Sequence, residues 1–369
     1  MSDGKNGFEK TKHNFPYKWT LKDAVFTKDK GKVFSCFACG GGSTMGYKLA
    51  GFDVLGCNEI DPKMMEAYKA NHNPKYAYLE PIQTFKLRED LPKELYELDI
   101  LDGSPPCSSF SMAGNREKDW GKEKKFREGQ AEQILDNLFF DFIDLAKKLQ
   151  PKVVIAENVK GLLVGEAKEY VRKIYREFDL AGYYVQHWLL DASKMGVPQR
   201  RERVFFIALR KDLAEPFLEQ VDMFTVLPKL KLEFDEPEIP FSCVKTNELD
   251  RPFKLGTKII EIFNSRIFGD KDFSCTCGRI YNKPNLLFNY NYIYDDKVAN
   301  TITAKSHDVV FNSNVPRYYN HKETISLATF PTDYNFGKQQ PHYMCGMSVP
   351  PVVMANISEQ IYLQWLSKI

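Results

Sequence analysis

The sequence predicts an α/β protein with a doubly wound, mostly parallel sheet and a second, smaller and irregular domain. From residue 32 to residue 210, apolar runs of strand length alternate with amphipathic segments of helix length. This alternation is typical of βα units whose sheet is covered on both faces. After about residue 211 it ends, because prolines separate short apolar runs and Asn and Tyr become dense between 281 and 294. The length of 369 residues also fits roughly two domains of about 150 residues each.

The composition is that of a globular protein in a reducing compartment. Hydrophobic residues make up 43% of the chain, with 27 Phe, 19 Tyr and 4 Trp, which argues against disorder. Eight cysteines are too few for a disulfide scaffold. No run of about 18 apolar residues occurs, and the first residues lack the apolar core of a signal peptide. We therefore expect a cytoplasmic protein without a membrane segment. The net charge of +2 names no partner.

The elements follow from the spacing of apolar residues. Parallel strands are predicted at residues 32–37, 54–57, 98–101 and 153–156, and an antiparallel pair at 183–190 and 204–209. Helices are predicted where apolar residues recur three and four apart, because that spacing places one stripe against the sheet. These segments are residues 134–149, 167–178 and 350–369, the first ended by Gln150 and Pro151.

The residues after each strand form the candidate site, since ligands bind beyond the carboxyl ends of parallel strands. The first strand leads into a Gly-rich turn, residues 37–46, where missing side chains let a nucleotide-like ligand approach the backbone. The second strand ends at Glu59, 19 residues after Gly40, the spacing at which an acid accepts ribose hydroxyls. A pair of solvated acids, Glu59 and Asp61, is the alternative interpretation.

The third and fourth strands end in residues suited to catalysis. Pro105 and Pro106 hold the backbone before Cys107, so we expect an accessible, nucleophilic thiol, although free thiols are more often buried. Glu157 follows four apolar residues, where partial desolvation favours the protonated acid and makes it a proton donor near neutrality. A charge at the N-terminus of the following helix is the alternative for Glu157.

A turn rich in arginine precedes the last predicted strand of the sheet. In residues 196–203 the order is Gly-Val-Pro-Gln-Arg-Arg-Glu-Arg. Residues two apart on an extended chain share a face, so Gln199, Arg201 and Arg203 are expected to point one way. A pair of guanidinium groups can bind carbonyl or phosphate oxygens. A solvated basic turn is the alternative.

Taken together, these segments resemble the cytosine-5 DNA methyltransferases. They occur in that family's order: Gly-rich turn, acid, Pro-Cys loop, Glu-Asn-Val and Gln-x-Arg-x-Arg. The match covers nearly all of residues 32–210 and resumes at about 316–356, where residues 317–323 with 330–334 are similar to the penultimate motif and residues 346–350 to the last. The resemblance implies the Rossmann-like fold of S-adenosylmethionine-dependent methyltransferases.

The resemblance implies S-adenosylmethionine as the cofactor and S-adenosylhomocysteine as the product. Glu59 would bind the ribose, and Phe37 would lie against the adenine or the sulfonium, because an aromatic face attracts positive charge. The implied cofactor-binding residues are Phe37, Gly40, Gly41, Gly42, Glu59, Ile60, Glu80, Pro105, Met347 and Ser348.

The resemblance also implies that cytosine is rotated out of double-stranded DNA, since its reacting carbons cannot be reached inside the stacked duplex. The Cys107 thiolate would add to C6, Glu157 would protonate or hydrogen-bond N3, and Arg201 would hold O2. Arg203 is the fourth implied catalytic residue. C5 would take the methyl group, and loss of its proton would release Cys107. The implied substrate-binding residues are Pro106, Ser108, Ser111, Asn158, Val159 and Gln199.

Four segments are expected on this basis. They are an N-terminal extension, 1–30, a catalytic and cofactor-binding domain, 31–210, a target-recognition domain, 211–330, and a C-terminal segment, 331–369, that returns to the catalytic domain. The basic loop 115–128 is expected to contact DNA phosphates. By residue type, base contacts are expected from Arg251, Arg266, Arg279, Asn282, Lys283, Asn289 and Asn291.

Some positions depart from the family pattern. Cys39 replaces a usual Gly, Met347 a usual Asn and Lys322 a usual Arg, and the register of Glu80 is ambiguous. These departures affect single assignments, whereas Cys107, Glu157 and Arg201 are all present.

Double-stranded DNA is the expected partner of a monomer that needs no metal. Cys275 and Cys277, with Cys243, do not supply the two spaced pairs that structural zinc usually needs. The alternatives are a tRNA cytosine-5 methyltransferase, a catalytically silent DNA-binding homologue and a dinucleotide-dependent oxidoreductase. A bacterial or phage origin is expected, as in restriction-modification systems.

Overall fold

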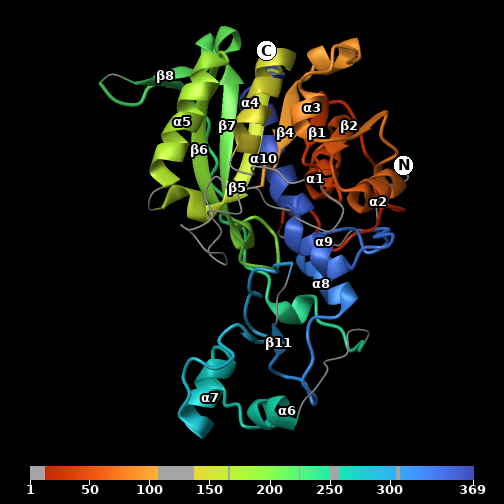
Figure 1. Ribbon diagram of the computed structural model, residues 1–369, viewed down its shortest axis with the longest axis vertical. Coiled ribbons are helices and arrows are strands. Elements are labelled where there is room, and N and C mark those ends of the chain that lie inside the picture. Colours follow the sequence, from red (N-terminus) through yellow and green to blue (C-terminus); the bar gives the residue numbers. More distant parts are fainter. Residues whose placement is uncertain (1–12, 107–136, 165–166, 224, 250–256, 305–307) are drawn as a thin grey trace, which may run out of the picture.

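The computed structural model describes residues 13–106, 137–164, 167–223, 225–249, 257–304 and 308–369. Two lobes are visible in Figure 1. The upper one, here called the sheet lobe, contains the main sheet and the last helix of the chain. The lower one, the small lobe, consists of the described residues between 241 and 320 and carries α6 (Thr257–Asn264) and α7 (Phe273–Tyr281).

The main sheet has seven strands in the order β3-β2-β1-β4-β5-β7-β6. Their bounds are β1 (Lys32–Cys36), β2 (Asp53–Glu59), β3 (Tyr76–Leu79), β4 (Ile100–Gly103), β5 (Val153–Val159), β6 (Tyr183–Asp191) and β7 (Glu202–Arg210). All pairings are parallel except those of β7, which is antiparallel to both β5 and β6. The predicted mostly parallel sheet is therefore confirmed. The order reverses between β1 and β4, and ligands bind at such a switch point.

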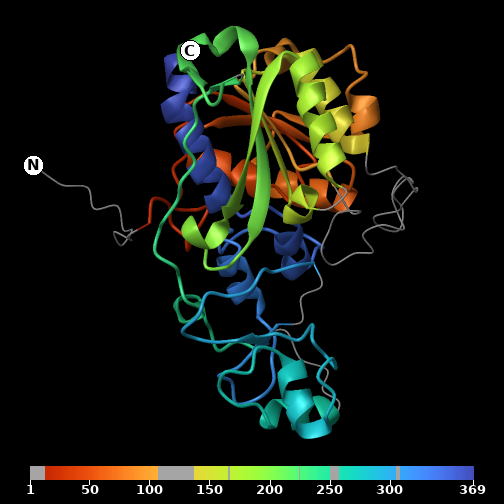
Figure 2. The same cartoon turned by 90° about the vertical axis from the view of Figure 1, so that its left-hand side faces the viewer.

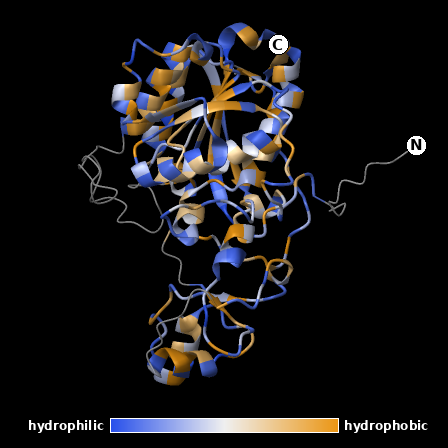
Figure 3. Ribbon diagram, turned by 90° about the vertical axis from the view of Figure 1, so that its right-hand side faces the viewer, coloured by the Kyte–Doolittle hydropathy of each residue, from blue (hydrophilic) through white to orange (hydrophobic). Residues whose placement is uncertain are grey.

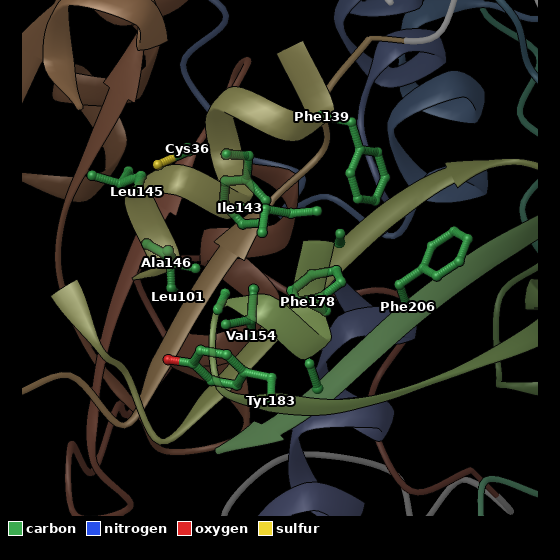
Figure 4. Close-up of a cluster of buried hydrophobic side chains, with 14 of the residues drawn as sticks. Cys36, Leu101, Phe139, Ile143, Leu145, Ala146, Val154, Phe178, Tyr183 and Phe206 are labelled. Carbon is green, nitrogen blue, oxygen red and sulfur yellow. The ribbon is translucent and has the colours of Figure 1, made fainter. Parts of the chain in front are cut away.

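Helices cover both faces of this sheet, as a doubly wound fold requires (Figure 2). One face packs against α3 (Ile82–Phe85), α4 (Leu138–Leu149) and α5 (Ala167–Leu180) through a buried cluster that includes Phe142 and Phe206. Figure 4 shows part of this cluster, with Ile143 and Phe178 facing Val154 and Tyr183. The other face packs against α1 (Gly42–Leu49) and α10 (Pro351–Gln364). The strands are apolar while the covering helices alternate polar and apolar faces (Figure 3).

The remaining α-helices and strands lie outside the main sheet and the helices already named. They are α2 (Pro62–His72), β8 (Leu218–Gln220), β9 (Val226–Pro228), β10 (Tyr292–Ile293), β11 (Val309–Val310), α8 (His321–Leu327) and α9 (Pro341–Met347). After β9 the chain still packs on the sheet lobe, because Leu230 and Leu232 belong to the α10 cluster. From Phe241 its apolar side chains join the small lobe's own cluster. None of the helices in these described ranges is both long and apolar enough to cross a membrane.

Three element predictions need correction. The first strand ends at Cys36 because Phe37 has a φ of 50°, which ends the extended conformation. The helix predicted over 134–149 is described from Leu138, and residues 134–136 lie outside the described residues. The helix predicted over 350–369 ends at Gln364, and a short 3-10 turn, Leu366–Lys368, follows it.

Candidate functional site

The Gly-rich turn packs against the C-terminal segment and contains three residues with positive φ. Phe37 and Cys39 have φ of 50° and Gly41 has φ of 88°. A Cβ on Gly41 would lie 2.1 Å from Nε2 of His72, and one on Gly40 would lie 2.2 Å from Sδ of Met344. Both contacts are far inside van der Waals distance, so the glycines are needed for α2 and α9 to pack against the turn.

Glu59 lies at the end of β2 beside this turn. Its carboxylate accepts hydrogen bonds from the backbone amides of Cys39 (2.7 Å), Ile60 (2.9 Å) and Asp61 (2.8 Å). Burial raises the pKa of Glu59, and the three amides oppose that shift by stabilising the charged form. Glu59 therefore joins the Gly-rich turn to the start of α2, where Asp61 caps the helix.

Glu80 lies next to Glu59, since its amide donates to the Glu59 carbonyl at 3.2 Å. Its carboxylate accepts from Arg88 and from Thr84, each at 3.0 Å. The resemblance assigned Glu80 to the cofactor site. In the structure its carboxylate is bonded to Arg88 and Thr84, at the edge of the Gly-rich turn.

The other predicted cofactor residues surround the same turn unevenly. The half-buried Phe37 ring packs edge to face on the Phe142 ring, with the two ring centroids 6.3 Å apart. Ser348 is buried, donates to the Met344 carbonyl at 2.8 Å and has its oxygen 3.7 Å from Sγ of Cys39. Burial raises the pKa of the Cys39 thiol to about 12, so it stays protonated at neutral pH. Met347 is 38% exposed.

Glu157 and Arg203 meet at the carboxyl end of β5. The register pairs Val159 with Arg203, so Glu157 and Arg203 are diagonal neighbours on one face of the β5–β7 ladder. Oε1 of Glu157 lies 3.1 Å from Nε of Arg203, and Glu157 is 9% exposed. An acid and a guanidinium are thus adjacent and nearly buried.

The chain before Cys107 is tied to the same strand end. Asn158 donates from Nδ2 to the carbonyl of Pro105 at 3.2 Å, and its Oδ1 accepts from the amide of Val159 at 2.8 Å. Pro105 is buried and Pro106 is half-buried. Cys107, Ser108 and Ser111, together with the basic loop 115–128, lie outside the described residues.

The side chains of Gln199 and Arg201 bond to other segments than Arg203 does. Arg201 is 4% exposed and donates to the carbonyls of Ile302 (2.9 Å) and Gly346 (3.1 Å). Gln199 donates to the Leu327 carbonyl at 2.7 Å and accepts from the Ile302 amide at 3.1 Å. The guanidinium that the resemblance assigned to the base therefore joins the lobes, and Arg203 is the arginine at Glu157.

Burial lowers the pKa of Arg201 to about 9, so the group remains charged at neutral pH. Its Nε has no hydrogen-bond partner among the described residues. A buried charge bonded to two carbonyls is a strong link between distant segments.

Sequence reasoning missed two buried polar groups next to the site. Asp102 in β4 accepts from Oγ of Ser35 (2.6 Å) and Oη of Tyr47 (3.1 Å), and burial raises its pKa to about 7. Below the Gly-rich turn, Oη of Tyr334 donates to the Gly40 carbonyl and lies 2.9 Å from Nε2 of His72. Tyr334 falls in a recognised motif, whereas no pattern marked Asp102 or His72.

Several candidate base contacts are engaged inside the small lobe. Arg266 donates to the carbonyls of Phe311 and Phe263, and both Nη atoms of Arg279 bond Asp270 at 2.8 Å. Asn291 donates to Asp308 at 2.9 Å. Exposed candidates are Asn282, Lys283 and Asn289, and Arg251 lies outside the described residues. Within the described ranges no three His, Cys, Asp or Glu side chains are grouped as metal ligands, and Cys275 and Cys277 both lie on α7.

Comparison with known proteins gives a consistent result. A family model described as C-5 cytosine-specific DNA methylase matches residues 31–363. Type II methyltransferase M.FnuDI of Fusobacterium nucleatum is 38% identical over 182 residues, which cover 49% of this chain and 48% of that protein. Type II methyltransferase M.NgoFVII of Neisseria gonorrhoeae is 25% identical over 348 residues, 91% of this chain and 87% of that protein. The chain spans about half the length of M.FnuDI and of the similar M.NgoPII.

Solved structures show the same fold at low identity. A prophage-encoded protein (E. coli) has a TM-score of 0.63 and 20% identity, covering 90% of this chain and 99% of that one. A variant of DNMT2 from Spodoptera frugiperda has a TM-score of 0.59 and 18% identity, with 90% and 99% covered.

Proposed function

Because the chain belongs to the C-5 cytosine-specific DNA methylases, we propose that it transfers a methyl group from S-adenosylmethionine to C5 of cytosine in double-stranded DNA. One observation carries the proposal. The Glu157 carboxyl lies against Arg203 at a strand end whose Asn158 holds Pro105, two residues before Cys107. An acid, a guanidinium and the residues that lead to a cysteine thus share one edge of the sheet.

The residues around the Gly-rich turn fit S-adenosylmethionine, which supplies the methyl group in electrophilic form. The Glu59 carboxylate has about four acceptor positions, and three backbone amides use three of them. One position is left for a ribose hydroxyl. Phe37 offers a half-buried ring to the adenine or the sulfonium. In this proposal Gly40, Gly41, Gly42, Ile60, Glu80, Pro105, Met347 and Ser348 complete the site.

The proposed reaction begins when cytosine is rotated out of the duplex into the space beside Glu157. The Cys107 thiolate adds to C6, and Glu157 donates a hydrogen bond or a proton to N3, which stabilises the charge that the addition creates. We assign O2 to Arg203 in place of Arg201, because Arg203 contacts Glu157 while Arg201 bonds two carbonyls. C5 takes the methyl group, and loss of its proton expels Cys107.

The proposal assigns DNA contacts to the small lobe. We place target recognition in residues 241–320, a narrower range than the 211–330 expected from the resemblance, because Leu230 and Leu232 pack on the sheet lobe. Pro106, Ser108, Ser111, Asn158, Val159 and Gln199 remain the proposed contacts around the rotated base, Gln199 acting through Ile302.

Bisulfite sequencing of DNA from cells that express the chain tests the activity and reveals the target sequence. Tritiated methyl transfer then compares the wild type with Cys107→Ser and Glu157→Gln at matched DNA binding. Each variant should lose about a hundredfold or more in turnover, as expected when a positioned nucleophile or acid is removed. Transfer RNA as competitor separates DNA from RNA as the substrate. Full activity of Cys107→Ser would exclude the covalent mechanism.

A further inference from the structure

A cavity of about 190 Å³ lies where the arginine turn meets the small lobe. Arg200 lines one side, and the other walls come from Asp270 and Lys271, from the region of β10 and from residues 297–300. The turn is fastened here, because the Arg200 amide donates to the Ala299 carbonyl at 2.9 Å and Thr301 Oγ1 donates to the Arg200 carbonyl at 2.5 Å. The cavity therefore has a fixed position relative to Arg203, three residues further along.

The walls of the cavity are held rigidly. The Tyr294 ring stacks on Phe311 with centroids 4.5 Å apart, and its hydroxyl donates to the Asp270 carbonyl at 2.7 Å. The Gly269 amide donates to the same hydroxyl at 3.1 Å. Tyr292, Ile293 and Ala299 are each at most 3% exposed. A site built on such a frame changes little when a ligand enters, which keeps the cost of binding low.

The cavity is positively charged. Three cations line it, Arg200, Lys271 and Lys297, and Asp270 is the only carboxylate among its lining residues. Both oxygens of Asp270 are taken by Arg279 at 2.8 Å. The ammonium of Lys297 lies 4.6 Å from the centroid of the Tyr294 ring. In the described part of the chain, no carboxylate pairs with Lys271 or Lys297, and the exposed Arg200 reaches Glu238 only at 3.9 Å.

We propose that this cavity binds one backbone phosphate of the DNA, on the strand that carries the rotated cytosine. The proposal rests on the function proposed above and adds a subsite to it. Three residues of chain span at most about 10 Å, and successive phosphates on one strand are about 3.4 Å apart along the duplex axis. We therefore expect the bound phosphate within about three nucleotides of the cytosine held by Arg203. Such a contact positions the duplex without reading its sequence.

The test is a scan with neutral phosphates. DNA duplexes that contain the methylated site receive a single methylphosphonate at each position within five nucleotides of the target cytosine. The wild type should lose affinity severalfold at one position within about three nucleotides of the target cytosine. The double variant Lys271→Gln/Lys297→Gln should bind all-phosphate DNA more weakly than the wild type. At that one position, a methylphosphonate should no longer lower its affinity. The slope of log affinity against log salt concentration should be smaller by about 0.9, the value for one phosphate contact.

Lys229→Gln/Lys231→Gln is the matched control. It removes the same charge from exposed lysines on the sheet lobe, which pair with Glu219 and Glu233. The control should keep the wild-type salt slope and the wild-type sensitivity to the neutral phosphate. The single variants Lys271→Gln and Lys297→Gln, each with a measured melting temperature, replace the double variant if it does not fold.

Two outcomes overturn the inference. If the cavity variants match the control in slope and in neutral-phosphate sensitivity, no DNA phosphate binds there. If the cavity variants bind DNA more weakly but keep the wild-type sensitivity to the neutral phosphate at every position, the two lysines act only through long-range charge and the cavity holds no phosphate. Failure of the wild type to methylate DNA is a separate result, which rejects the proposed function itself.

Discussion

Arg201 and Arg203 are two residues apart and belong to one motif, yet their surroundings give them different tasks. Arg203 forms an ion pair with Glu157 and keeps 19% of its side chain exposed, whereas Arg201 is buried and donates to the carbonyls of Ile302 and Gly346. The partners of Arg201 lie 101 and 145 residues away in the sequence. The motif predicts an arginine-rich site, but only long-range packing decides which arginine lies at Glu157.

Substitution should separate the two arginines. Arg203→Gln is expected to lower methyl transfer about a hundredfold, through loss of a positioned charged donor, with a small change in stability. Arg201→Gln is expected to lower the free energy of unfolding by about 2–4 kcal/mol, because two buried carbonyls lose charged donors. Tritiated methyl transfer and urea denaturation measure the two effects. If Arg201→Gln lost methyl transfer and Arg203→Gln lost only stability, Arg201 would be the residue that binds O2 of the cytosine.

Asp102 should make stability depend on pH. Burial raises its pKa to about 7 from an ordinary 3.8, with the nearby Glu157 charge adding to the shift. Between these values the folded protein keeps a proton that the unfolded chain has lost, so the free energy of unfolding falls as pH rises toward 7. Each unit of pKa difference corresponds to about 1.4 kcal/mol.

Asp102→Asn removes this titration while keeping an acceptor for Ser35 or Tyr47. Melting temperatures of wild type and variant are compared at pH 5 and pH 8. The variant should gain stability relative to the wild type between the two values. If the difference in melting temperature between variant and wild type is the same at pH 5 and pH 8, Asp102 does not titrate in this range.

At the scale of elements, strands that carry several buried apolar residues were predictable, whereas β3 was not. The predictions for β4, β5, β6 and β7 agree with the structure within a few residues. β4, β5 and β7 are mostly buried, and the edge strand β6 still places Tyr183, Val185 and Leu190 in the core. β3 was missed, since none of the residues in Tyr76–Leu79 is fully buried. The order of the strands and the packing of α9 on the Gly-rich turn depend on contacts between distant segments, which periodicity does not encode.

Glycine in helix α1 illustrates packing that overrides helix propensity. A Cβ on Gly46 would lie 2.3 Å from the Pro351 carbonyl oxygen and 2.7 Å from Cβ of Met354 in α10. Ala is better than Gly in a helix by about 1 kcal/mol, but overpacking costs about 1–3 kcal/mol. Gly46→Ala should therefore destabilise the protein in urea denaturation.

Gly278→Ala in α7 is the matched control. There the nearest atom to a new Cβ, Cα of Pro284, is at 3.4 Å, an ordinary contact. The higher helix propensity of Ala should therefore determine the change in stability, and the variant should be more stable than the wild type by up to about 1 kcal/mol. Equal effects of the two substitutions would show that α1 and α10 can move apart.

At the scale of the whole molecule, a buried ion pair joins the small lobe to α8. Arg317 donates from both Nη atoms to Glu323, at 2.7 and 2.8 Å, and from Nη2 to the Thr246 carbonyl at 3.1 Å. Glu323 is 0% exposed. Its carboxylate also accepts from the Thr246 amide at 2.9 Å and completes the cap of α8 with Asn320.

Breaking the Arg317–Glu323 pair should lower the free energy of unfolding much more than breaking the exposed Lys322–Glu248 pair beside it. Glu323→Gln leaves the Arg317 charge buried without its partner, and we expect a loss of about 3–5 kcal/mol. Glu248→Gln breaks the exposed pair with Lys322 and should cost about 1 kcal/mol or less. Guanidinium chloride denaturation measures both, and similar losses would mean that the lobes are not joined through Glu323.

The close contact between Met344 and the Gly-rich turn has a consequence for folding. The turn precedes the small lobe in the sequence, whereas α9 and α10, which pack on it and on α1, follow that lobe. Contacts between segments so far apart in the sequence close a long loop, and the entropy of that closure opposes folding before the contacts form. The turn therefore takes its final shape only after residues on both sides of the small lobe have come together.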